Sequence, residues 1–67
     1  MITLTLNGEL RSLPQQQTVL DFLSERDLQP RFVVVEHNGS VLSRDRFGEV
    51  LLSEGDVVEI VHMMGGG

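Results

Sequence analysis

Apolar and polar residues alternate at the start of the chain, and this alternation predicts a β-hairpin. Ile2, Leu4 and Leu6 fall on one face of an extended strand, with threonines between them on the other face. An Asn-Gly pair follows at 7–8, and it favours a two-residue type I′ turn because both positions need a positive φ. A return strand is therefore expected over 9–13.

The spacing of apolar residues then changes to three and four, which predicts a short helix over 18–27. The apolar face of this helix is formed by Val19, Phe22 and Leu23. Thr18 is expected to cap its N-terminus, and Asp21 three residues later completes a weak capping box. The helix should end before Pro30, since a proline disfavours helical geometry in the residue that precedes it.

The second half of the chain predicts further strands. Residues 32–35 form a near-continuous apolar run, typical of a strand covered on both faces. Asn-Gly at 38–39 again indicates a turn, with a short return strand after it. The segment 43–52 is irregular, and we expect Phe47 and Leu51 to anchor it as a loop with a helical turn.

The last strand is expected after a turn at 53–56 that contains glycine. In this strand Val58 and Ile60 share one face, and Val57, Glu59 and Val61 share the other. The simplest place for the strand is beside the first one and parallel to it. The order of elements therefore predicts an α+β roll, in which a mixed sheet of about five strands is covered by one helix.

Length limits the classes of function. A chain of 67 residues forms one small domain, whose core can hardly enclose the roughly 300–1,000 Å³ that a small-molecule pocket needs. This argues against a self-contained enzyme. No apolar run approaches the ~20 residues of a membrane span, and the first residues do not resemble a signal peptide. Cysteine is absent, which fits an intracellular, cytoplasmic location.

Charge and side-chain chemistry narrow the picture further. The net charge is −5, so the surface should repel nucleic acid. Such a surface would steer a partner with a basic groove toward the chain, but on charge alone simple solubility is the preferred interpretation. His37 and His62 lack the spacing or the carboxylate cluster of a metal site, so no metal is expected. Arg44 and Arg46 form the only local basic pair, which can contact a partner's acidic groups or pair with nearby acids. The sequence leaves both possibilities open.

The chain ends in three glycines directly after an apolar strand. A frayed end or a cloning remnant is one explanation, since termini are commonly disordered. Alternatively, Gly65, Gly66 and Gly67 form a flexible arm without side chains. From Met63 to Gly67 such an arm reaches about 17 Å. It can thread a narrow tunnel into another protein's active site and present its carboxylate there.

These features together resemble one family, the ThiS sulfur carriers of thiamine biosynthesis, small relatives of ubiquitin with the β-grasp fold. The similarity covers the whole chain and is most specific in "EGDVVEIVHMMGGG". The chain departs from the usual pattern at Val57, where a polar residue is expected, and at Met63–Met64. The resemblance implies a β-grasp domain over 1–64 and a flexible glycine tail over 65–67.

The resemblance also implies a mechanism. A ubiquitin-activating-type adenylyltransferase would use ATP and magnesium to adenylate Gly67, and a sulfur donor protein would convert the adenylate to a thiocarboxylate. Thiazole synthase would then take the sulfur into the thiazole ring. The carrier would be a protein co-substrate, not an enzyme, and would bind no cofactor itself. Residues expected to contact the partners are Arg44, Val61, Met63 and Met64.

Other functions use the same tail. A sulfur carrier for molybdopterin or tRNA thiolation shares the fold, and a ubiquitin-like modifier joined to target lysines is a different class. The third alternative is a simple interaction domain with an incidental tail. The chain has neither lysine nor cysteine, the side chains that attack activated acyl groups. An activated Gly67 therefore cannot acylate a sibling's side chain, which favours sulfur delivery over chain-forming modification.

Overall fold

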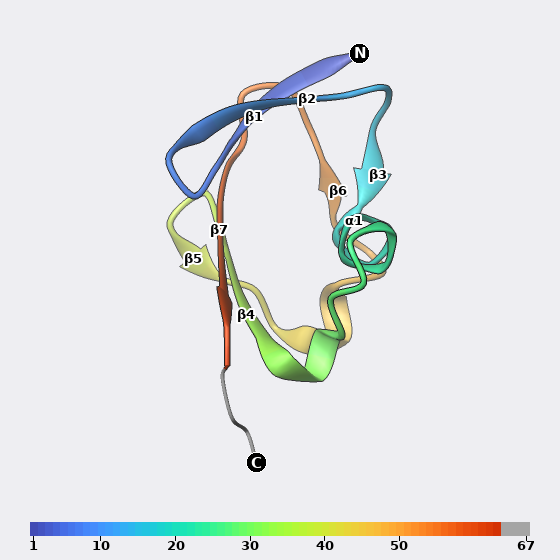
Figure 1. Cartoon of the computed structure of the whole chain (residues 1–67), viewed down its shortest axis with the longest axis vertical. Coiled ribbons are helices and arrows are strands. Elements are labelled where there is room, and N and C mark those ends of the chain that lie inside the picture. The colour runs from blue at the N-terminus through green and yellow to red at the C-terminus, as the bar shows by residue number, and fades with distance from the viewer. Residues whose placement is uncertain (64–67) are drawn as a thin grey trace.

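A computed structural model describes residues 1–63 of the chain (Figure 1). The strands are β1 (Ile2–Leu6), β2 (Glu9–Leu13), β3 (Gln17–Thr18), β4 (Val33–His37), β5 (Ser40–Val41), β6 (Leu51–Leu52) and β7 (Val57–His62). The helix α1 spans Val19–Glu25, and 3-10 turns lie at Pro30–Phe32 and Arg44–Arg46. No helix in this part of the chain is long and apolar enough to cross a membrane.

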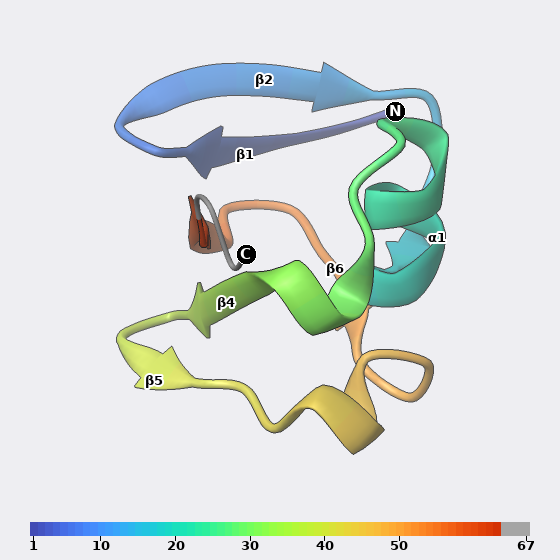
Figure 2. The ribbon, with the colours of Figure 1, turned by 60° about the horizontal axis from the view of Figure 1, so that its bottom comes forward.

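Five strands form one mixed sheet in the order β2-β1-β7-β4-β5. Strand β7 runs parallel to β1, as the sequence predicted for the last strand, and it also pairs antiparallel with β4. In Figure 2 the strands follow one another from β2 at the top to β5 at the bottom, and α1 lies to one side. The predicted α+β roll, a five-stranded mixed sheet covered by one helix, is confirmed.

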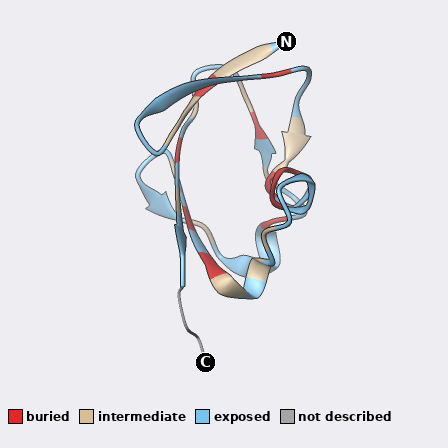
Figure 3. Ribbon diagram, in the orientation of Figure 1, coloured by how far each residue is buried: buried red, intermediate tan, exposed pale blue. Residues whose placement is uncertain are grey.

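The core lies between the sheet and α1. Figure 3 shows that buried positions gather on the helix and on the strands that face it. The buried side chains are Leu4, Leu13, Val19, Phe22, Leu23, Val33, Val35, Phe47, Leu52 and Val58. Ile2, Leu6 and Ile60 pack against this cluster and are partly buried. The face of β1 and β7 that the alternation assigned to the core is therefore the correct one.

Local signals place the turns and the helix start where the sequence predicted them. Asn7 and Gly8 have φ of 50° and 84°, and the second Asn-Gly pair has 53° and 89°. Positive φ at both positions is what a type I′ turn requires. The Thr18 hydroxyl oxygen accepts a hydrogen bond from the Asp21 amide at 3.0 Å and caps α1.

The apolar run at 32–35 is not a strand covered on both faces. Phe32 belongs to a 3-10 turn, and β4 begins at Val33. Val33 and Val35 are buried, but Val34 between them is 36% exposed. The prediction was wrong because α1 covers only one side of the sheet, so the other side keeps an exposed valine.

The prediction of which residues anchor the segment 43–52 in the core was partly wrong. Phe47 is buried, as predicted, but Leu51 is half exposed and Leu52 is the second buried residue. The reason is a two-stranded sheet of β3 and β6 that the sequence did not predict, in which Thr18 pairs with Leu51. Alternation along β6 then turns Leu52 into the core.

Candidate functional site

The face of the five-stranded sheet turned away from α1 carries exposed apolar side chains, and we call it the outer face. Its large apolar residues are Leu10, Val34, Val41, Val57 and Val61. They come from four strands, β2, β4, β5 and β7. Exposed apolar side chains gathered on one face of a small protein make that face a candidate interaction surface.

Val61 and Val34 lie directly opposite one another on this face. Val61 was predicted from the sequence to contact a partner, and it is 60% exposed. Val34 was missed, because its run of valines looked like a buried strand. The placement of Val61 agrees with a docking role, and the role itself stays a prediction.

The end of β7 holds the chain firmly to the sheet up to Met63. His62 lies opposite Val33, and the Met63 amide donates a hydrogen bond to the Phe32 carbonyl at 2.7 Å. Met63 is partly exposed. Met64 and Gly65–Gly67, which carry the predicted tail and the domain boundary at 64, lie outside the described residues.

Arg44 lies at the border of the outer face. Its Nε donates to the Pro30 carbonyl at 2.9 Å, and its side chain lines a shallow groove of about 220 Å³ together with Val34 and Val41. The neighbouring Arg46 contacts Glu49 at 3.6 Å. The sequence left open whether this arginine pair contacts a partner or pairs with nearby acids, and Arg46 pairs with a nearby acid. Arg44 has no acidic partner within residues 1–63 and stands beside the apolar face.

A polar cluster that the sequence did not reveal links the 38–39 turn to the start of β7. The His37 Nε2 lies 2.8 Å from the Asp56 Oδ2, and the Asn38 amide group donates to Asp56 Oδ1 at 3.2 Å. The Ser53 backbone N–H also donates to Asp56, at 2.9 Å. Burial raises the pKa of Asp56, but these hydrogen bonds lower it more, so its pKa lies below the ordinary value.

This cluster is structural. His37, for which the sequence offered no metal-site spacing, is paired with Asp56. No group of three His, Asp or Glu residues within 1–63 is arranged to hold a metal ion. His62, at the end of β7, is exposed.

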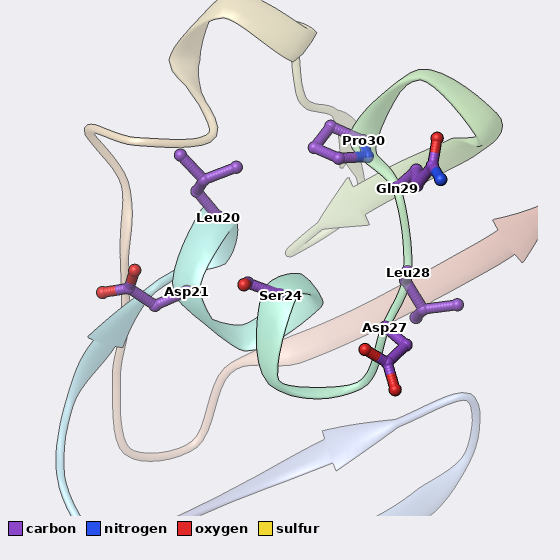
Figure 4. Close-up of a pocket in the computed structure, with 7 residues that line it drawn as sticks. All are labelled: Leu20, Asp21, Ser24, Asp27, Leu28, Gln29 and Pro30. Carbon is purple, nitrogen blue, oxygen red and sulfur yellow. The ribbon is translucent and has the colours of Figure 1, made fainter.

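An open groove of about 620 Å³ runs along α1, on the other side of the sheet from the outer face (Figure 4). Leu20, Asp21 and Ser24 come from the helix, and the remaining lining residues come from the segment 27–30 that follows it. The lining residues include acidic side chains but no nucleophile paired with a general base, the arrangement that would indicate catalysis. Arg44, Val61 and Met63, the described residues among those predicted to contact a partner, do not line it.

Comparison with known proteins agrees with this architecture. A model of the ThiS family matches residues 4–67. The chain is 38% identical to the sulfur carrier protein ThiS of Bacillus subtilis (strain 168), over 96% of this chain and 98% of that protein. A crystal structure of a thiamine biosynthesis protein (ThiS) from Geobacter metallireducens superposes with a TM-score of 0.83 at 36% identity, covering 98% and 100% of the two chains.

A second group of relatives is larger. The chain is 40% identical to part of a thiazole synthase from Magnetococcus marinus, and the match covers 92% of this chain but only 19% of that protein. A thiazole synthase of Paramagnetospirillum magneticum matches at 36% identity, over 96% of this chain and 20% of that protein. A domain like this one therefore forms about a fifth of each of these two proteins.

Proposed function

Since this chain belongs to the ThiS family, we propose that it is a sulfur carrier of thiamine biosynthesis whose sulfur is carried as a thiocarboxylate on Gly67. The observation that carries the proposal is the family match, which runs through the glycines to residue 67. Both the family and the named relatives favour the thiamine pathway over molybdopterin synthesis or tRNA thiolation.

The chemistry requires activation of a carboxylate. The Gly67 carboxylate would attack the α-phosphorus of ATP, and pyrophosphate would leave. Hydrosulfide released by the sulfur donor would then attack the acyl carbon of the adenylate, and AMP would leave with the oxygen that had joined it to the acyl group. The product is a thiocarboxylate, which is a good sulfur nucleophile, whereas a free carboxylate is a poor electrophile without this activation.

We assign ATP and magnesium to a ubiquitin-activating-type adenylyltransferase and the sulfur to a donor protein. In this scheme the chain is a protein co-substrate and not an enzyme. It supplies a carboxyl group, an arm and a docking face. The absence of lysine and cysteine supports this division, since no side-chain amine or thiol of the carrier competes for the activated acyl group.

We propose thiazole synthase as the acceptor of the sulfur. The support is that two proteins of this name contain a segment similar to this chain, so a domain like this one is joined to a thiazole synthase in one polypeptide. We also place the carrier in the cytoplasm, because a chain without cysteine fits a reducing compartment.

The test is an intact-mass measurement. The protein is incubated with its cognate adenylyltransferase, ATP, magnesium and a sulfur source, and the mass should rise by the difference between one sulfur and one oxygen. A variant that lacks Gly67 is the control and should not change. An unchanged mass of the full chain, under conditions that load a known carrier, would refute the proposal. Isopeptide-linked ladders in cell extracts would instead indicate a protein modifier.

A further inference from the structure

Two glutamates face one another at the centre of the outer face. Glu36 of β4 and Glu59 of β7 are direct partners in the antiparallel register, and both are exposed. Side chains at such positions project from Cβ atoms only about 4.5–5.5 Å apart, and like charges placed there destabilise a sheet. The fold therefore keeps an unfavourable pair in its central strands.

Nothing within residues 1–63 neutralises this pair. The acidic residues that form ion pairs in this part of the chain are Glu9, Glu25, Glu49 and Asp56. Arg44, at the border of the outer face, is engaged by the Pro30 carbonyl. Proteins tend to keep a destabilising arrangement, such as this pair of like charges, at positions where it serves a function.

Valines border the two carboxylates along β4 and β7 and on β5. Val34 and Val61, another directly opposed pair, lie next along β4 and β7, while Val41 pairs across from Glu36 on β5. Val57 precedes Glu59 by two residues on the same face. A partner that covers these valines removes water from the carboxylates, and desolvation makes a matching positive charge essential.

A second copy of this chain is a poor occupant of the face. A twofold contact through β4 and β7 would bring four carboxylates together between two molecules of net charge −5. The complementary occupant is an apolar protein surface with one arginine, because a planar guanidinium has enough N–H donors to bond two carboxylates at once.

We propose that thiazole synthase docks on the outer face and inserts one arginine between Glu36 and Glu59. This rests on the function proposed above, and the choice of occupant follows from the relatives that join a similar domain to thiazole synthase in one chain. The glutamate pair then selects the correct partner and keeps the carrier from associating with itself. The instability of the free pair is relieved only in the complex.

Glu59→Lys tests this because it moves stability and binding in opposite directions. The new cation lies opposite Glu36, so the like-charge repulsion is replaced by attraction and the melting temperature should rise by about 1–5 °C. The same cation occupies the place of the partner's arginine. Affinity for purified thiazole synthase, measured by titration calorimetry, should fall more than about tenfold.

Glu25→Lys on α1 is the matched control. It changes the net charge by the same amount but lies on the helix, and Glu25 makes only a 3.9 Å contact with Arg26. Its affinity should stay within about twofold of wild type at moderate salt, since distant surface charges are screened. A Glu36→Gln variant should weaken binding without loss of stability, which separates the carboxylate's role from that of the sheet.

Three results would overturn the proposal. Wild-type affinity of Glu59→Lys would show that no cation sits between the glutamates, and a wild-type dimer through the outer face would make a second copy the occupant. Failure of the wild-type carrier to bind thiazole synthase would show that this enzyme is not the occupant of the outer face. Loading of Gly67 with sulfur needs no thiazole synthase, so the intact-mass assay still tests the proposed function separately.

Discussion

Asp27 closes helix α1 in the left-handed region, with φ of 58°. The Leu28 amide donates to the Leu23 carbonyl at 2.9 Å and the Asp27 amide donates to the Ser24 carbonyl at 3.1 Å. These two bonds form a Schellman motif, whose left-handed position usually holds glycine. An L-residue pays a steric cost there that glycine avoids, although a short polar side chain such as aspartate tolerates it better than most.

Asp27→Gly should therefore stabilise the domain by about 0.5 kcal/mol, because relief of the steric cost exceeds the extra chain entropy of glycine. For a domain of this size that corresponds to a rise of roughly 2–4 °C in Tm, measured by thermal unfolding. Asp27→Ala is the control and should lower the Tm, since alanine keeps the Cβ and loses the polar group. A glycine variant that melts below wild type would contradict this account.

Asp56 makes stability depend on pH. Its pKa in the folded state lies below the ordinary value of 3.8, so the unfolded chain binds the proton more tightly. The stabilisation is fully present above about pH 4 and is lost as the pH falls through the ordinary pKa toward the folded one.

Asp56→Asn should lower the free energy of unfolding by about 1–3 kcal/mol at pH 7, because the hydrogen bonds from His37 and the Ser53 amide lose a charged acceptor. Near pH 3 the difference from wild type should shrink, because Asp56 of the unfolded wild-type chain is then largely protonated and part of the stabilisation from its lowered folded-state pKa is lost. Urea unfolding at the two pH values measures this. An equal difference at both would show that the charge of Asp56 does not contribute.

At the scale of elements, β7 divides its residues between two environments. Val58 is 1% exposed and packs in the core, whereas Val57 beside it is 48% exposed on the outer face. The strand is also central, since it joins β1 to β4. Strand β7 therefore contributes both to the core and to the outer face. Its successive side chains point to opposite sides of the sheet, so the two sets of residues are distinct.

Val58→Asp should unfold the domain. An unpaired carboxylate in the core costs several kcal/mol, comparable to the roughly 3–5 kcal/mol that a core of this size supplies. Val57→Asp is the matched control and should change stability by less than about 1 kcal/mol, because its side chain points to solvent. Circular dichroism melts compare the two. A cooperative melt of Val58→Asp near that of wild type would mean that the faces of β7 are reversed.

At the scale of the whole molecule, the two sheets, the helix and the core all lie within residues 1–63. The proposed chemistry belongs to Gly67, beyond them. Folding and sulfur loading should therefore be separable by mutation, which is expected of a carrier whose partners perform the reaction.

Gly66→Val should leave the Tm unchanged and abolish adenylation. A β-branched side chain restricts the backbone and adds bulk, so the Gly67 carboxylate would no longer reach the α-phosphate of ATP in a narrow tunnel. Pyrophosphate exchange measures adenylation, and Gly66→Ala should show an intermediate rate. Exchange by Gly66→Val at the wild-type rate would mean that the tail is not threaded as proposed.

The sequence by itself determined the features that depend on neighbouring residues. Both Asn-Gly turns, the Thr18 cap and the inner face of β7 follow from local conformational preference and from a period of two or four residues. The glycines at 65–67 and the strand before them were enough to indicate the family. The docking role of Val61 and Met63 remains a prediction that the geometry allows.

The tertiary structure alone decided which residues meet between segments that no tight turn joins. Contacts between segments far apart in the chain determine three features: the pairing of β3 with β6, the exposure of Val34, and the burial of Leu52 in place of the predicted Leu51. The same is true of His37 with Asp56 and of Glu36 opposite Glu59. Register between strands that no tight turn joins is set by how the strands and α1 share one core, and no single local segment encodes it.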